Sequence, residues 1–180
     1  VLSAVNNTVG RWSDADRFYA RAAAGQTMWG GLTAAAWQYI GRQGVLQGTY
    51  ELFGTIARTH FGAAPGSEAD ALSGRWVLTS GLGGMGSAQP ISARMLGLSS
   101  LTAEVDPVKA ERLLATGALD LVTESLDDAL AALHQAKSAA ETVAIALLAN
   151  AADVFAEIAA RGVVPDIVTV AKHFGGGVGI

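Results

Sequence analysis

The sequence predicts an α/β fold built on a parallel sheet with helices on both faces, and two observations carry this prediction. From residue 72 onward, short apolar runs alternate with helical stretches, which is typical of parallel strands linked by helices. The first apolar run leads into Gly81-Leu-Gly83-Gly84-Met85-Gly86, whose G-x-G-x-x-G spacing belongs to strand-to-helix turns that bind dinucleotides. We therefore predict a Rossmann-like sheet, preceded by an irregular N-terminal segment that belongs to a larger core.

The strands and helices are expected in a regular order. Strands are predicted over residues 76–79, 101–105, 119–122, 143–148 and 167–170, where apolar and β-branched residues gather. Helices are predicted between them over residues 87–98, 108–115, 125–140 and 151–161. Ser87 is able to cap the first of these helices. Gly162 stops the last helix, and Pro165 precedes the last strand.

The chain before the sheet is less regular. A helix is predicted over residues 47–60, and a Pro/Gly/Ser-rich surface loop over residues 61–70. All four tryptophans and all three tyrosines lie within the first 76 residues, an aromatic load that usually needs another domain or subunit to cover it. We divide the chain into an N-terminal core segment (residues 1–48), a Rossmann-like NAD-binding domain (49–170) and a glycine-rich core loop (171–180).

Composition excludes several classes of partner. The formal net charge is −4 and no run of Lys or Arg occurs, so neither nucleic acid nor an anionic membrane is expected as a partner. No apolar stretch approaches the roughly 20 residues that span a bilayer, and no secretory signal is visible at the N-terminus. The chain contains no cysteine, which fits a cytoplasmic protein.

The glycine cluster predicts a dinucleotide site. Gly81 permits the tight turn, Gly83 lets the backbone approach a pyrophosphate, and Gly86 lets the following helix pack close to the strand. Glu104 lies near the end of the second strand, roughly 20 residues after the glycines, where a carboxylate binds the ribose of NAD. Because strand, turn, helix, strand and acid appear in order, a dinucleotide site is favoured over a merely tight turn.

Other polar residues have two interpretations each. Asn150 follows the fourth strand directly, so its side chain either hydrogen-bonds the cofactor or caps the next helix. Lys109 either faces a phosphate or is an ordinary solvated lysine. His60 and His134 lie in predicted helices, and no Asp or Glu is spaced along the chain so as to pair with either of them. His173 precedes three glycines, which form either an anion nest or a flexible terminal loop. No catalytic residue is assigned, and the sequence shows no metal-ligand cluster, nucleophile elbow or P-loop.

Several longer runs of residues are distinctive beyond the glycine cluster. They are Met28-Trp-Gly-Gly-Leu-Thr33, Trp37-Gln-Tyr-Ile-Gly41, Gln43-Gly-Val-Leu-Gln-Gly-Thr-Tyr-Glu51, His60-Phe-Gly62, Gly74-Arg-Trp-Val-Leu-Thr-Ser-Gly-Leu-Gly-Gly-Met-Gly-Ser-Ala-Gln-Pro90, Leu126-Asp-Asp-Ala-Leu130, Asn150-Ala-Ala152 and Arg161-Gly-Val-Val-Pro-Asp-Ile-Val-Thr169. With these runs the chain resembles the urocanase (urocanate hydratase) family from residue 1 to about residue 169.

The resemblance implies a hydro-lyase of histidine breakdown that uses tightly bound NAD+ as an electrophile. In the family, the nicotinamide ring bonds to the imidazole side of urocanate, and water adds to give imidazolone propionate. The resemblance also implies that this chain forms a homodimer and takes urocanate as its small-molecule partner. The implied cofactor contacts are Gly84, Met85, Gly86, Glu104, Lys109, Asn150 and Ala151, with Gly175, Gly176 and Gly177 in the tail.

The chain departs from the family pattern in several places. It has Gly31 in place of a cofactor-binding glutamine, and Lys109 in place of an arginine. Lysine lacks the planar guanidinium with which arginine makes bidentate contacts. The family segment D-Q-T-S-A-H-D is replaced by Val170-Ala-Lys-His173, and the active-site cysteine is missing. The chain is therefore either a part of a urocanase-like protein or a shortened relative, and little or no hydratase activity is expected of it alone. A non-catalytic NAD-binding or scaffold domain and an NAD-dependent oxidoreductase are the alternatives.

Overall fold

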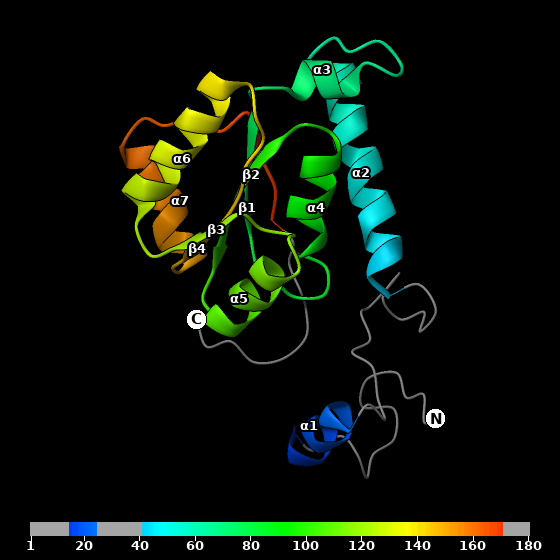
Figure 1. The fold of residues 1–180 in the computed structure, drawn as a ribbon, viewed down its shortest axis with the longest axis vertical. Helices are drawn as coiled ribbons and strands as arrows, with labels where there is room; N and C mark the ends of the chain where they lie inside the picture. Colours follow the sequence, from blue (N-terminus) through cyan, green and yellow to red (C-terminus); the bar gives the residue numbers. More distant parts are fainter. Residues whose placement is uncertain (1–14, 25–40, 171–180) are drawn as a thin grey trace.

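The computed structural model describes residues 15–24 and 41–170, and its centre is a parallel sheet. The strands are β1 (Trp76–Ser80), β2 (Ser99–Glu104), β3 (Leu121–Thr123), β4 (Ala144–Leu148) and β5 (Ile167–Val168). Their order across the sheet is β3-β4-β2-β1-β5, and every neighbouring pair is parallel (Figure 1). The predicted α/β class with a parallel sheet is confirmed.

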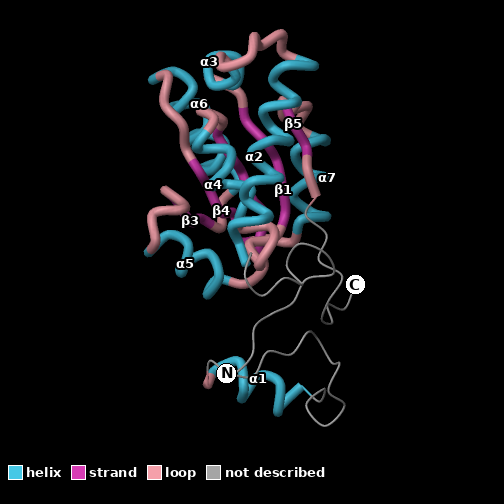
Figure 2. The backbone as a smooth tube through the Cα atoms, turned by 90° about the vertical axis from the view of Figure 1, so that its right-hand side faces the viewer, coloured by secondary structure: helices cyan, strands magenta, loops and turns pink. Residues whose placement is uncertain are grey.

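Helices cover both faces of this sheet, as predicted. The connections between strands contain α4 (Ala88–Met95), α5 (Pro107–Ala115), α6 (Leu126–Ala139) and α7 (Ala151–Ala160). Before the sheet come α1 (Ala15–Ala23), α2 (Gly41–His60) and α3 (Glu68–Leu72). Figure 1 shows α6 and α7 on one side of the sheet, and α4 with α2 outside it on the other. Figure 2, turned by 90°, shows α3 at one end of the strands and α5 toward the other.

The apolar core is divided by the sheet into two layers. On one face, Leu78, Leu101 and Ile145 pack against α6 and α7. On the other face, Val77 packs against α2 and α4, and Ala144 packs with α5. This division follows from the pleat, because successive residues of a strand point to opposite faces.

α4 lies between the sheet and α2. Its residues Ala88, Ser92 and Ala93 have no exposed surface, and the Ser92 hydroxyl donates to the carbonyl of Leu46 in α2 over 3.0 Å. Small side chains at these positions let the helix approach both neighbours closely. The first turn of α4 is thereby held next to the point where the chain leaves β1, which fixes the position of the glycine cluster.

α2 begins earlier than the sequence predicted. It starts at Gly41, six residues before the expected start, so the predicted division between residues 48 and 49 falls inside this helix. Gly44 and Gly48 lower helix propensity, which is why the pattern favoured a later start. Packing against α4 outweighs this propensity, because Thr49 and Phe53 of α2 are buried there.

Other differences are local. α3 begins within the stretch predicted as a surface loop; Leu72 is fully buried, and Glu68 forms an ion pair with Arg58 of α2 at 2.5 Å. α1 is a helix in the segment that was predicted to be irregular. β5 pairs with β1 over two residues, fewer than the four predicted. The predicted cofactor contacts Gly175, Gly176 and Gly177, like Gly31 and His173, lie outside the described residues.

Candidate functional site

The carboxyl ends of β1, β2 and β4 lie at one edge of the sheet and form the candidate site. α4 and α5, which follow β1 and β2, cover one face, whereas α7, which follows β4, covers the other. The neighbouring strands β2 and β4 continue into α5 on one face and α7 on the other, so their connections leave toward opposite faces of the sheet, and we call the switch point between them the crevice. Ligands of open α/β sheets bind at such switch points, and the glycine cluster lies one strand away, after β1.

Two glycines of the cluster are required by the backbone. Gly81 has a φ of 82°, a conformation that side chains disfavour, and its N–H donates to the Ala103 carbonyl of β2 over 2.8 Å. A Cβ on Gly86 would lie 2.0 Å from the carbonyl oxygen of Gly81, so no larger residue fits without moving the turn. Both glycines therefore serve the tight turn and the close approach of α4 that their spacing predicted.

The middle of the cluster has the opposite character. A Cβ on Gly83 or Gly84 would meet no atom within 4 Å, so the backbone there faces open space. Within the described part of the chain, no atom accepts a hydrogen bond from the backbone N–H of Gly83, Gly84, Met85 or Gly86. These N–H groups precede the first turn of α4, where the helix dipole also favours negative charge. The loop is therefore suited to hold an anion such as a diphosphate.

Glu104 holds this loop in place. The residue is only 5% exposed, and its Oε2 accepts from the N–H of Leu82 at 2.5 Å. Oε1 accepts from the N–H groups of Val105 and Asp106 at 2.9 and 3.0 Å. A carboxylate offers about four acceptor positions, and these contacts use three of them. One position remains for a ribose hydroxyl, so the predicted contact between Glu104 and ribose stays a prediction.

The residues after Glu104 form the rim of the crevice. Asp106 caps α5, because Oδ1 accepts from the N–H of Val108 at 3.0 Å, and Lys109 lies 3.4 Å from Oδ2 of Asp106. Lys109 therefore forms an ion pair on the helix, and its predicted phosphate contact stays a prediction. Sequence reasoning missed Asp106, although an Asp directly before Pro107 is a typical start of a helix.

Asn150 and Ala151 lie at the end of β4, on the other side of the crevice. The Asn150 side chain accepts from the N–H of Ala152 at 2.9 Å, which confirms the interpretation as a helix cap. Its amide nitrogen remains available to donate to a ligand. The N–H of Ala149 donates to the Glu104 carbonyl at 3.1 Å, so the ends of β2 and β4 are joined directly. Ala151 opens α7 beside them.

The other end of the cluster is anchored by contacts that the sequence did not predict. Ser87 does not cap α4: its side chain makes no capping hydrogen bond, and its backbone is already helical. Gln89, which is nearly buried, instead accepts from the Thr169 hydroxyl at 3.1 Å. The Thr169 N–H donates to the Leu78 carbonyl, which ties the chain after β5 to both β1 and α4.

No histidine is found at this edge among the described residues. His60 ends α2, and His134 lies on α6 beside a pocket at the opposite edge of the sheet. Among the described residues, no three His, Cys, Asp or Glu side chains form a group that could hold a metal ion. None of the described helices is long and apolar enough to cross a membrane.

The parallel sheet, the glycine turn and the buried acid at the end of β2 define a Rossmann-like α/β domain. The family model of the urocanase Rossmann-like domain matches residues 41–172, and this chain belongs to the urocanase family. The match starts at Gly41, where α2 also starts.

Among solved structures, the chain is similar to L-tryptophan dehydrogenase from Nostoc punctiforme, with 14% sequence identity and a TM-score of 0.33. The similarity covers 73% of this chain and 41% of the dehydrogenase, so the chain spans less than half of that protein. At this level the similarity indicates nothing about ligand or activity.

Proposed function

We propose that this chain forms the NAD+-binding part of a urocanate hydratase. The observation that carries the proposal is the row of backbone N–H groups from Gly83 to Gly86, which have no acceptor among the described residues, together with the open space beside Gly83 and Gly84. Membership of the urocanase family supports the choice of reaction. In that reaction NAD+ serves as an electrophile, through which water adds to urocanate to give imidazolone propionate.

The residues of the crevice fit the parts of the cofactor in order. The N–H groups of the cluster hold the diphosphate, and the open surface above Gly83 and Gly84 admits it. The remaining acceptor position of Glu104 takes a hydroxyl of the adenosine ribose. Val105 and Val108, which are 62% and 68% exposed beside it, offer an apolar surface to the adenine ring. The Asn150 amide and Ala151 border the path toward the nicotinamide.

The crevice holds the cofactor but does not complete a hydration site. Adding water to urocanate needs groups that bind its carboxylate and transfer protons close to the nicotinamide. The described residues that we have placed at this edge supply backbone N–H groups, the buried Glu104 carboxylate, the Asp106–Lys109 ion pair and the Asn150 amide. We therefore propose that the proton-transfer groups come from another part of a longer protein or of a partner subunit, and that this chain alone has little or no hydratase activity. The proposed full assembly is a cytoplasmic homo-oligomer.

Calorimetric titration of the full chain with NAD+ and NADP+ tests the proposal. We expect NAD+ to bind and NADP+ to bind at least about 10-fold more weakly, because the 2′-phosphate would approach Glu104 and Asp106. Equal affinity for both nucleotides would refute the role given to Glu104, and the absence of NAD+ binding would refute the proposal as a whole.

Activity measurements on the same protein separate the alternative functions. Loss of urocanate absorbance in the ultraviolet would show that the chain contains a complete hydratase site. NADH formation with an oxidisable substrate would favour an oxidoreductase. Tight NAD+ binding without either reaction is the result we expect, and it also fits a non-catalytic NAD-binding or scaffold domain. Restoring hydratase activity by adding the remainder of a urocanase would distinguish the two.

A further inference from the structure

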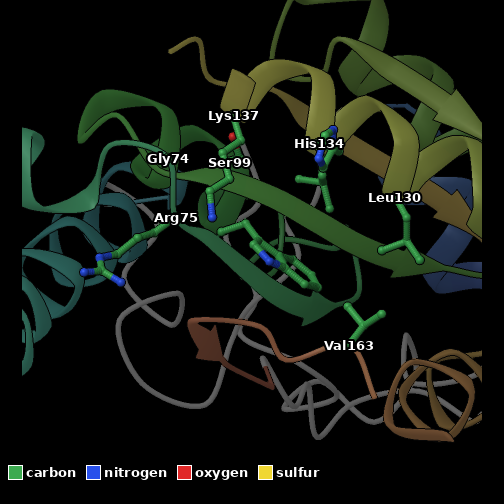
Figure 3. A pocket seen from close by; sticks show the side chains of 9 residues that line it. Gly74, Arg75, Ser99, Leu130, His134, Lys137 and Val163 are labelled. Carbon is green, nitrogen blue, oxygen red and sulfur yellow. The ribbon is translucent and has the colours of Figure 1, made fainter. Parts of the chain in front are cut away.

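A pocket lies at the amino ends of the strands, at the edge of the sheet opposite the glycine cluster. Its volume is about 290 Å³, near the lower end of the roughly 300–1,000 Å³ that ligand pockets span. Trp76 opens β1 and Ser99 opens β2 at its base, and Val163 borders it before β5. Figure 3 shows Leu130, His134 and Lys137 along α6 on one side and Val163 on the other.

The lining of this pocket combines an apolar base with basic groups. Trp76, Leu130, Leu133 and Val163 make most of its surface apolar. His134 and Lys137 are three residues apart on α6 and therefore lie on the same side of the helix, next to the apolar base. The residues that line the pocket include no Asp or Glu, although the whole chain carries a net charge of −4.

The two basic side chains on α6 have no other partner among the described residues. No ion pair or side-chain hydrogen bond links Lys137 or His134 to another described residue. Arg75 is different, because its guanidinium pairs with Asp166 at 2.9 Å and stacks over the Phe61 ring, and Figure 3 shows it directed away from the pocket. The pocket therefore combines an aromatic surface with an unneutralised ammonium group.

We propose that this pocket binds a small aromatic carboxylate. The ring lies against Trp76 between the apolar side chains of α6 and Val163, where aromatic contact adds to burial of apolar surface. The carboxylate accepts from the Lys137 ammonium, and the His134 imidazole is a second donor. The site shares no residue with the nucleotide crevice, so this inference does not depend on the proposed function.

The test uses 3-phenylpropionate as the probe and the full chain labelled for NMR. We expect saturable shifts of the Trp76 indole N–H and of the Leu130 and Val163 methyl groups at millimolar probe. The uncharged amide of the same acid should bind about 5- to 10-fold more weakly, because it lacks the charge-assisted contact with Lys137.

Two variants separate the charge contact from general effects. Lys137→Met keeps the apolar stem and removes the ammonium, so it should weaken binding of the acid about 5- to 10-fold and leave the amide unchanged. Arg112→Met, a charge removal on the exposed side of α5, should change neither. Equal binding of acid and amide, an unaltered acid affinity in Lys137→Met, or no shifts at the pocket would overturn the proposal. Contacts in the free protein between the Val163 methyls and residues 1–40 or 171–180 would also overturn it, because the chain itself would then fill the pocket.

Discussion

The two proposed sites, one at each edge of the sheet, would recognise their ligands by different means. At the carboxyl edge, the proposed contacts come from backbone N–H groups of the glycine cluster, held by the buried Glu104 carboxylate. At the amino edge, the pocket is lined by side chains, chiefly Trp76 and the α6 residues Leu130 and Lys137. A site built from backbone N–H groups depends on glycines, so a Gly→Ala substitution is enough to disturb it. A pocket built from side chains depends instead on the chemistry of a few residues.

The largest expected effect is that of Gly86→Ala. Its Cβ would lie 2.0 Å from the Gly81 carbonyl oxygen, so the turn must open, and we expect a loss of about 3 kcal/mol in unfolding free energy together with loss of NAD+ binding. Chemical denaturation and calorimetric titration measure the two quantities. Gly83→Ala is the matched control, because its Cβ meets nothing within 4 Å. It should change stability by no more than about 0.5 kcal/mol while still weakening NAD+. If Gly83→Ala binds NAD+ as the wild type does, the diphosphate does not approach this backbone.

Removing the Glu104 carboxylate, which holds the glycine cluster through the Leu82 N–H, should have the next largest effect. Glu104→Ala leaves the N–H of Leu82 without its acceptor, and we expect a loss of about 1–3 kcal/mol in unfolding free energy. Glu111→Ala, at an exposed position on α5, should have little effect. NAD+ affinity should fall in Glu104→Ala even at temperatures where the variant is fully folded. Unchanged stability would show that the contact between Glu104 and Leu82 does not hold the loop.

Two helix caps, Asn150 and Ser125, allow the capping role of a residue to be separated from a role in binding NAD+. Asn150 caps α7 and Ser125 caps α6, each by accepting from a backbone N–H of the first turn. Replacing either by Ala should lower stability by about 1 kcal/mol in thermal or chemical unfolding. Only Asn150→Ala should also weaken NAD+, because α6 follows β3, outside the crevice. Equal NAD+ affinity in both variants would limit Asn150 to its capping role.

The smallest expected effect lies near the amino edge, where α3 is joined to α2. The Arg58 guanidinium donates to the Glu68 carboxylate and holds the pKa of Glu68 below its ordinary value of 4.5. The stabilisation from this pair is therefore present above about pH 4.5 and is lost as the pH falls through the lowered pKa. In Glu68→Gln, the melting temperature should fall slightly less than in the wild type as the pH is lowered below about 4.5, and NAD+ binding should be unchanged. An unchanged acid profile in Glu68→Gln would contradict this contribution.

Sequence reasoning found the carboxyl edge because the glycine spacing records a backbone geometry. Gly81 is required by its positive φ, and Gly86 by its close contact with the Gly81 carbonyl. Both constraints select glycine, so both are visible in the sequence. The alternation of apolar runs and helices likewise follows from burial, which is why the β-α order and both helical layers were predicted.

The features that were missed depend on contacts between distant parts of the chain. The early start of α2 depends on packing against α4, which outweighs the low propensity of its glycines. The carboxylate of Glu104 faces inward because the Leu82 N–H lies across from it, 22 residues away in sequence. The pocket around Trp76 combines residues from β1, β2, α6 and the loop before β5, and no local pattern marks such a set.

The most direct measurement of the central claim is an NMR titration of the labelled chain with NAD+, following the backbone amides of Gly83, Gly84, Met85 and Gly86. If these N–H groups hold the diphosphate, their signals should show the largest changes, and inorganic pyrophosphate should shift the same signals more weakly. Large shifts confined to other residues, with these four amides unchanged at saturating NAD+, would contradict it.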